Sequence, residues 1–546
     1  MCRRALSSFV LPLLLTGGLA ACGGSGSGNP EPGSGGSSGS SGGATGSGGS
    51  TSSGGKTGSG GSTSSGGAVG SGGKTGSGGT TGSGGSKPGS GGTSASGGTQ
   101  GTGGTAATGG SSGTAGAGGH GTGSGGTAGA TPGSGGAAAG GSTGSGGVMG
   151  SAGSSGASAE DDGADCTVGT LPSNGTKNAM LPDPFKKLDG TEMTMKSEWR
   201  CRREEILQTA EKIALGTKPP KPDMVTGTVT SSKITVMVTV GGKSSTFSAT
   251  VTPPTSGKAP YPAVIEYDSG GFAPPLDSAT LNSEGIAVIT YNPYDVGAEG
   301  NGHGANQKGA FYSVYSGGSG TTGLLAAWAW GASRIIDVIA QSDGTVLKAD
   351  ALAVSGCSRF GKGAFIAGVL DQRFALTMPV ESGTDGVPIW RGIAKAEKGE
   401  NGNPPQSMSS AYSEQPWYYD GSMGIDADPT VAPMDTHELV AMVAPRGLFI
   451  MENPHIGELA SKYGHVAALG AVEVYKALGV GDAVTYYSDV QSGTHCSARP
   501  EWVTPLKNNV ERFLNKTGTA AGVIKPFSSQ TGDLSTWRDW TTPTLN

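Results

Sequence analysis

Apolar side chains recur at regular spacings in the part of the chain that follows residue 180. Ile234, Val236, Val238 and Val240 lie two residues apart, which predicts a half-buried strand. Short apolar runs predict further strands over residues 263–267, 286–290, 351–354, 375–380, 449–451 and 484–487. Longer segments predict helices over residues 197–215, 323–340 and 362–370. Strands that alternate with helices predict a mainly parallel sheet with helices on both faces.

The first 160 residues lack this patterning. Of the 105 glycines in the 546-residue chain, 61 precede Asp161, within repeats of Gly, Ser, Thr and Ala. Such a composition has too few apolar side chains to offset the conformational entropy of folding. We therefore expect residues 23–160 to be a disordered linker. Residues 165–546 are long enough for one large α/β domain or two small ones.

The start of the chain predicts an export signal. Arg3 and Arg4 precede an apolar stretch over residues 9–15, and small residues follow it. Leu19-Ala20-Ala21-Cys22 resembles a bacterial lipobox, so residues 1–22 would be a lipoprotein signal with Cys22 as the lipidated residue. An ordinary secretory signal with a chance cysteine is the alternative. We expect a bacterial cell-surface or outer-membrane lipoprotein, or a secreted protein.

Membrane contact is expected only through the lipid anchor, since no later segment has the roughly 18 apolar residues that a spanning helix needs. The chain carries 36 basic and 42 acidic residues, for a net charge of -6, and has no basic patch. These features exclude nucleic acid as a partner. A monomer is the expected state.

Four cysteines lie beyond the signal, and disulfides are plausible in an exported chain. They allow three connectivities, of which we favour Cys166–Cys201 together with Cys357–Cys496. No Cys-x-x-Cys pair is present, so a zinc site is not expected. We expect neither a metal nor an organic cofactor.

The second of these pairs would join the two best candidates for catalysis. Cys357 precedes Ser358, and Cys496 follows His495. A serine nucleophile needs an imidazole within hydrogen-bond reach to accept its proton, so the pairing indicates a serine hydrolase.

Ser358 lies in a turn between a predicted strand and a predicted helix, which is the context of a nucleophile elbow. The turn departs from the usual Gly-x-Ser-x-Gly because its second glycine, Gly361, comes one residue late. An ordinary turn serine is the alternative. Arg359 could assist the oxyanion and Lys362 could reach a substrate hydroxyl. A surface salt bridge and a solvated lysine are the alternatives for these two cations.

His495 follows a late strand, where an α/β hydrolase places its base, although a surface loop histidine is the alternative. The acid of a triad comes between the serine and the histidine in such enzymes. Glu381 and Glu452 each follow a predicted strand in that interval. Either carboxylate could hold the imidazole in one tautomer, and spacing alone does not choose between them.

Several segments together resemble the glucuronoyl esterases, carbohydrate esterase family 15. The segments that carry the resemblance are 356–362, 380–383, 444–447 and 494–496, with further similarity at 181–185, 199–202 and 539–545. The resemblance implies an α/β-hydrolase fold, a three-layer α/β/α sandwich, for the catalytic domain at 165–546.

The family resemblance also implies residue roles. Ser358 would be the nucleophile, His495 the base and Glu381 the orienting acid, with Arg359 supporting the oxyanion. The implied substrate is the ester that joins 4-O-methyl-glucuronic acid of glucuronoxylan to lignin alcohols. Another carbohydrate esterase, for acetylxylan or feruloyl groups, and a non-catalytic surface carbohydrate-binding protein are the alternatives.

The sugar-binding residues follow from the same resemblance. Lys362, Gln406 and Glu414 match residues that hold the hydroxyls of the glucuronic acid. Glu458 stands nearest to the place where the family often has a tryptophan, so we include it among the substrate-binding residues. Stacking on the sugar would then be weaker, or would come from Trp390 or Trp417.

Overall fold

The computed structural model describes residues 159–546 except 271–273, 396 and 520. The predicted signal at 1–22, the lipidation of Cys22 and almost all of the predicted linker at 23–160 lie outside the described residues. Within the described part, no helix is long and apolar enough to cross a membrane.

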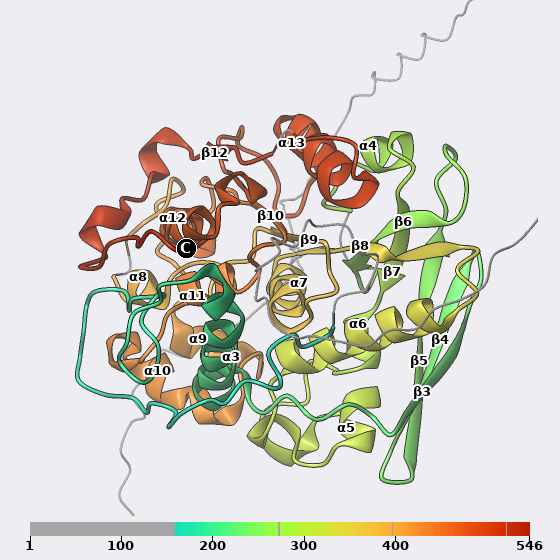
Figure 1. Cartoon of the computed structure of the whole chain (residues 1–546), viewed down its shortest axis with the longest axis horizontal. Helices are drawn as coiled ribbons and strands as arrows, with labels where there is room; N and C mark the ends of the chain where they lie inside the picture. Colours follow the sequence, from blue (N-terminus) through green and yellow to red (C-terminus); the bar gives the residue numbers. More distant parts are fainter. Residues whose placement is uncertain (1–158, 271–273, 396, 520) are drawn as a thin grey trace, which may run out of the picture. The chain divides into compact units, whose positions relative to one another are not determined.

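A single sheet forms the centre of the described domain (Figure 1). Its ten strands run in the order β12 (Ile524–Lys525), β11 (Val484–Tyr487), β10 (Gly447–Met451), β9 (Leu376–Val380), β8 (Leu347–Cys357), β6 (Tyr261–Tyr267), β7 (Ala287–Tyr291), β5 (Lys243–Thr252), β4 (Lys233–Val240) and β3 (Met224–Val229). Strands β12 to β7 in this order are parallel, and β5, β4 and β3 are antiparallel. The prediction of a mainly parallel sheet is confirmed.

Helices cover both faces of the sheet. One face packs against α6 (Leu324–Gln341), α7 (Arg359–Leu370) and α12 (Ser461–Leu478) through one apolar cluster. The other packs against α4 (Ser278–Ser283) and α13 (Pro500–Val510) through a second cluster. Figure 1 shows α4 and α13 on one side of the strands and α6 and α7 on the other. The domain is thus the predicted three-layer sandwich with an α/β-hydrolase fold.

The remaining α-helices lie in the segments that connect these layers or flank them. They are α3 (Trp199–Ala210), α5 (Ala310–Val314), α8 (Trp390–Ile393), α9 (Met408–Glu414), α10 (Met423–Ala427) and α11 (Thr436–Ala441). The helix predicted at 197–215 is α3, flanked by a 3-10 turn and a π-helical turn.

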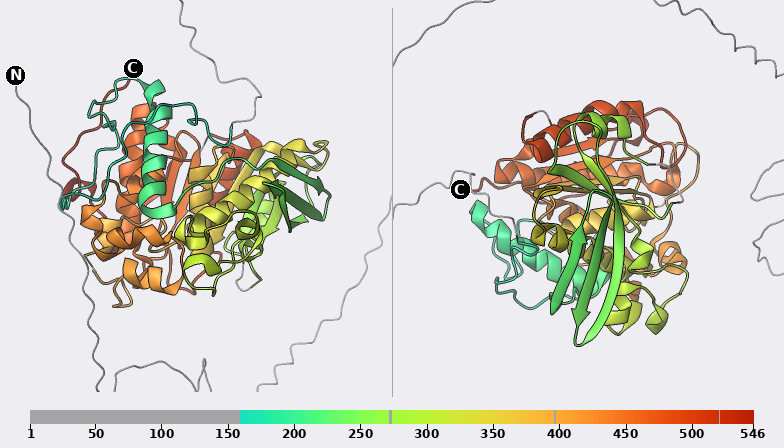
Figure 2. Two further views of the ribbon diagram at one scale, coloured as in Figure 1. Left: turned by 90° about the horizontal axis from the view of Figure 1, so that it is seen from below. Right: turned by 90° about the vertical axis from the view of Figure 1, so that its right-hand side faces the viewer.

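The antiparallel strands form one end of the domain (Figure 2). Strand β5 was not predicted, although Phe247, Ala249 and Val251 alternate with more exposed residues as in a half-buried strand. Serine and threonine residues occupy most of the other positions of β5, so few apolar side chains mark the strand in the sequence. Strand β3 was missed as well, because only Val225 is buried among its residues.

Candidate active site

The carboxyl ends of neighbouring parallel strands gather the candidate residues at one edge of the sheet. Ser358 follows β8, and its backbone N–H donates to Val380 O on β9 at 3.0 Å. Glu381 follows β9, and its N–H donates to Met451 O on β10 at 2.7 Å. Parallel strands present their C-terminal ends together, so residues far apart in sequence meet here.

The turn at Ser358 has the strained backbone of a nucleophile elbow. Ser358 adopts φ 60° and ψ -126°, a conformation that costs a non-glycine residue energy and that clusters at functional sites. A Cβ at Gly361 would lie 2.5 Å from Val380 O, so only glycine lets the first turn of α7 approach β9 this closely. This contact explains the late second glycine of the motif.

His495 and Glu381 form the central hydrogen bond of the site. His495 Nδ1 lies 2.5 Å from Glu381 Oε2, and Glu381 is fully buried. The backbone N–H of Cys496 donates to the same oxygen at 2.8 Å. Because Nδ1 is bound to the Glu381 carboxylate, the other ring nitrogen, Nε2, is the one that could accept a proton from a nucleophile.

Glu452 lies close to this pair but does not bond to the imidazole. It is fully buried, and neither carboxyl oxygen has a hydrogen-bond partner among the described residues. Burial, followed by the charge of Glu381, raises the pKa of Glu452 well above its usual value. Burial without a donor therefore disfavours the charged form of Glu452. The structure thus brings Glu381 rather than Glu452 to His495, a choice that the sequence left open.

Both favoured disulfides are present. Cys357 bonds to Cys496 with a Cα–Cα distance of 5.6 Å, and Cys166 bonds to Cys201 at 5.4 Å. Potential metal-ligating atoms of Cys357, Glu381, His495 and Cys496 lie within 4.8 Å of one another. Because both sulfurs of this group are oxidised to the disulfide, they offer no thiolate to a metal ion.

Arg499 is a site residue that the sequence reasoning missed. Its Nη2 donates to Glu381 Oε1 at 3.2 Å and to Thr494 O at 3.2 Å, and the side chain is buried. The guanidinium therefore binds the carboxylate and the chain that carries His495 at the same time. The only sequence signal was an arginine shortly after the histidine.

Lys362 is buried and points toward the backbone that follows Glu381. Its ammonium group donates to Ser382 O at 2.8 Å and to Thr384 O at 2.5 Å. It also lies 4.8 Å from the centre of the Trp417 ring. Burial lowers the pKa of Lys362 to about 8. The alternative of a solvated lysine is therefore excluded.

Arg359 connects the elbow to the predicted sugar-binding residues. Its guanidinium binds Glu299 at 2.6 Å and Glu414 at 2.9 Å. Gln406 Nε2 donates to the second oxygen of Glu414 at 2.8 Å, and the backbone N–H of Gln406 donates to Glu458 O at 3.4 Å. Three of the four predicted substrate-binding residues thus lie in one chain of contacts that starts at Arg359. They are Glu414, Gln406 and Glu458, and Lys362 lies outside this chain.

The two tryptophans expected to stack on a sugar do not offer an open ring face. Trp390 is fully buried, and Trp417 is 2% exposed. Trp417 donates through Nε1 to Glu299 at 2.7 Å and lies beneath Arg359 and Lys362. Of the two alternatives, this burial contradicts stacking by Trp390 or Trp417 and leaves weaker stacking on the sugar.

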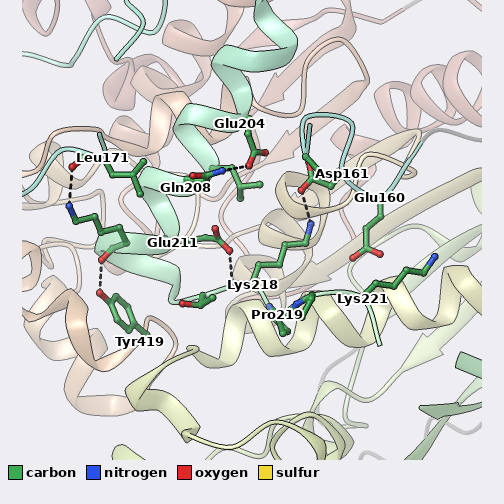
Figure 3. A pocket seen from close by; sticks show the side chains of 15 residues that line it. Glu160, Asp161, Leu171, Glu204, Gln208, Glu211, Lys218, Pro219, Lys221 and Tyr419 are labelled. Carbon is green, nitrogen blue, oxygen red and sulfur yellow. Dashed lines mark hydrogen bonds and ion pairs between the residues drawn. The ribbon is translucent and has the colours of Figure 1, made fainter. Parts of the chain in front are cut away.

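A separate cavity of about 780 Å³ lies against α3 (Figure 3). None of the predicted site residues lines it. Its charged groups bind protein atoms instead: Lys212 donates to Leu171 O at 3.0 Å, and Glu204 accepts from Gln208 at 2.7 Å. We therefore do not include this cavity in the candidate active site.

Comparison with known proteins agrees with this geometry. The family described as "Glucuronyl esterase, fungi" matches residues 236–479. The 4-O-methyl-glucuronoyl methylesterase of Hypocrea jecorina is 35% identical over 386 residues, which cover 70% of this chain and 80% of that relative. The chain belongs to the glucuronoyl esterase family.

Solved structures of other glucuronoyl esterases have the same fold. The catalytic domain from Hypocrea jecorina matches with a TM-score of 0.62 and 33% identity, covering 70% of this esterase and all (100%) of that domain. A mutant enzyme from Sporotrichum thermophile, solved with methyl 4-O-methyl-beta-D-glucopyranuronate, matches with a TM-score of 0.61, 33% identity and coverage of 70% and 100%. The protein is therefore an esterase. Its two disulfides are typical of exported proteins, and the esterase is an exported protein.

The two disulfides provide a matched pair of test variants. Replacing Cys357 and Cys496 by alanine opens a loop with a sequence separation of 139, and replacing Cys166 and Cys201 opens one of 35. The chain-entropy relation predicts losses of about 5 and about 4 kcal/mol in the free energy of unfolding, measurable by urea denaturation. We expect only the first variant also to lower kcat under folding conditions, because this disulfide ties the residue before Ser358 to the residue after His495. Equal losses of kcat in both variants would contradict a local role.

Proposed function

We propose that this esterase hydrolyses the ester that joins 4-O-methyl-glucuronic acid of glucuronoxylan to lignin alcohols. The observation that carries the proposal is the His495–Glu381 hydrogen bond beside a strained Ser358, which lies next to a set of polar side chains suited to a sugar. The names of the relatives and the ligand in the Sporotrichum structure support a glucuronate ester as substrate. The biological role would be the degradation of lignocellulose.

Ser358, His495 and Glu381 would perform the reaction in two steps. His495 Nε2 accepts the proton of the Ser358 hydroxyl as its oxygen attacks the uronate carbonyl carbon. The imidazolium then protonates the alcohol oxygen, and the alcohol leaves a glucuronoyl-serine ester. Water attacks this ester with His495 again as base, which releases glucuronic acid and restores the serine.

The oxyanion would be stabilised at the start of α7. The backbone N–H of Arg359 follows the nucleophile, which is the position that supplies one oxyanion donor in an elbow. The helix N-terminus adds a favourable dipole. The Arg359 guanidinium contributes positive charge nearby, although two carboxylates already bind it.

The glucuronic acid hydroxyls would bind to Lys362, Gln406, Glu414 and Glu458. Three of these belong to the chain of contacts that begins at Arg359, and Lys362 is one helical turn beyond Ser358. Ions and amides with fixed geometry hold hydroxyls better than mobile surface groups, because less entropy is lost on binding.

The chain would work outside the cell on an insoluble substrate. We propose that residues 1–22 direct export, that Cys22 carries a lipid anchor and that 23–160 form a flexible tether for the catalytic domain at 165–546. The lipobox-like sequence supports this proposal, and a freely secreted monomer is the alternative outcome. Metabolic labelling with a palmitate analogue in a bacterial host, with Cys22→Ser as control, separates the two.

A panel of esters tests the proposed substrate. We expect the purified protein to hydrolyse benzyl glucuronate, with kcat/KM at least tenfold above that for methyl galacturonate, acetylated xylan and a feruloyl ester (about 1.4 kcal/mol per tenfold). Ser358→Ala should lower kcat by about 10⁴-fold or more. Turnover of acetyl groups without turnover of glucuronate would replace this proposal by an acetylxylan esterase.

The assignment of the acid predicts different effects for two neighbouring glutamates. Glu381→Gln should lower kcat by roughly 10³- to 10⁴-fold, because an amide cannot hold the same tautomer or stabilise the imidazolium. Glu452→Gln should change kcat by less than about threefold, because Glu452 makes no hydrogen bond to the imidazole and an amide has nearly the same shape as its carboxyl group. Steady-state kinetics on benzyl glucuronate measure both effects. A larger loss of kcat in Glu452→Gln than in Glu381→Gln would make Glu452 the acid of the triad.

The contacts of Arg499 predict a loss of activity when its guanidinium is removed. Arg499→Met takes one donor from Glu381 and breaks the contact to Thr494 O, so kcat should fall by about tenfold while KM for benzyl glucuronate changes by less than about twofold. Arg499→Lys should restore part of kcat, because an ammonium group can still donate to the carboxylate. A fall in kcat that Arg499→Lys does not reverse would reduce Arg499 to a purely structural role.

A further inference from the structure

A second, smaller cavity lies beside the nucleophile elbow. It has a volume of about 220 Å³, and Cys357 and Phe360, which flank Ser358 and Arg359 in sequence, are among its lining residues. The cavity also borders the C-terminal ends of β6 and β7, through Tyr267 and Thr290. It is therefore placed at the same edge of the sheet as the candidate triad.

The walls of this cavity are mostly apolar. Pro275 and Leu276 line it ahead of α4, Leu281 lines it from α4, and Val288 lines it from β7. Leu276 and Leu281 belong to the apolar cluster that also contains Cys357 and Cys496. Apolar walls of this size suit one aromatic ring better than a sugar.

One buried carboxyl interrupts the apolar walls. Glu266 lines the cavity and is 6% exposed, and its Oε2 has no hydrogen-bond partner among the described residues. Burial raises the pKa of Glu266 to about 7, with a smaller contribution from Asp268. An unpaired buried carboxyl is costly, so its presence at a cavity wall points to a ligand that supplies a hydrogen-bond donor.

A disulfide links the wall of this cavity to the chain that carries the candidate base. Cys357, a lining residue, is bonded to Cys496, and Cys496 directly follows His495, the group that would protonate the leaving oxygen. The proposed sugar-binding residues Gln406 and Glu414 do not line this cavity. The cavity is therefore separate from the proposed sugar-binding residues, and the two parts of the ester would occupy different regions of the site.

We propose that this cavity binds the alcohol part of the ester and selects a para-hydroxyphenylpropanoid alcohol, whose phenolic hydroxyl donates to Glu266. The inference rests on the proposed function. Glu266 pairs in register with Ser355, three residues before Ser358. At about 3.3 Å per residue, the three residues from Ser355 to Ser358 span about 10 Å of backbone, a length that a phenol ring on a three-carbon alcohol can bridge.

Three glucuronate esters test this proposal, with methanol, phenylpropanol and para-hydroxyphenylpropanol as the alcohol. We expect wild-type kcat/KM to be about tenfold higher for the para-hydroxyphenylpropyl ester than for the phenylpropyl ester. Glu266→Leu should abolish this ratio, and Glu266→Gln should keep part of it, because an amide oxygen still accepts a hydrogen bond. Glu284→Gln, at an acid outside the cavity, is the matched control and should keep the wild-type ratio.

Calorimetric binding of free para-hydroxyphenylpropanol gives a readout that does not depend on hydrolysis. Binding to the wild type that is weakened about tenfold by Glu266→Leu supports the cavity even if none of the esters is hydrolysed, in which case only the proposed function fails. A wild-type ratio near one, an unchanged ratio in Glu266→Leu, or equal calorimetric affinity for both proteins would each overturn the inference. Circular dichroism of the variants excludes unfolding as the cause.

Discussion

The Glu381 carboxylate is the group on which the arrangement of the site depends. It is fully buried at the end of β9 and accepts hydrogen bonds from His495, from the backbone of Cys496 and from Arg499. A buried carboxylate is tolerated only when several donors satisfy it, so the loop that carries these three residues must close over it. The Cys357–Cys496 disulfide then fixes the same loop to the elbow. The position of His495, the proposed base, thus follows from the need to satisfy one buried carboxylate.

The two glutamates of the site show how environment decides chemical role. Glu381 is surrounded by donors and a guanidinium, whereas Glu452 is buried without hydrogen-bond partners among the described residues. Burial and the nearby charge of Glu381 raise the pKa of Glu452 well above its usual value. Only Glu381 has the donors that a buried carboxylate needs. Arg499 adds to this difference between the two environments, because it binds Glu381 and not Glu452.

Strain and polar contacts are concentrated around α7. Its first turn follows the strained Ser358 and touches the backbone of β9 at Gly361. Arg359 and Lys362 from the same helix lie over Trp417, and Arg359 extends to Glu414. One short helix therefore orients the proposed nucleophile, the expected oxyanion donor and two cations, of which Arg359 binds Glu414. The apolar cavity that contains Glu266 lies beside the same elbow. Its mostly apolar walls differ from the polar contacts around Arg359.

The sequence by itself determined the alternation of strands and helices, the elbow at Ser358 and the candidates His495, Arg359 and Lys362. Local spacing and turn chemistry encode these features, since each depends on neighbours within a few residues. Cysteine positions favoured one pairing among three but did not prove it. Only the tertiary structure decided between Glu381 and Glu452, revealed Arg499 and buried Trp390 and Trp417. These outcomes depend on which donors and apolar surfaces meet across β8, β9, β10 and the loop after β11, and such contacts are set by burial in three dimensions rather than by spacing along the chain.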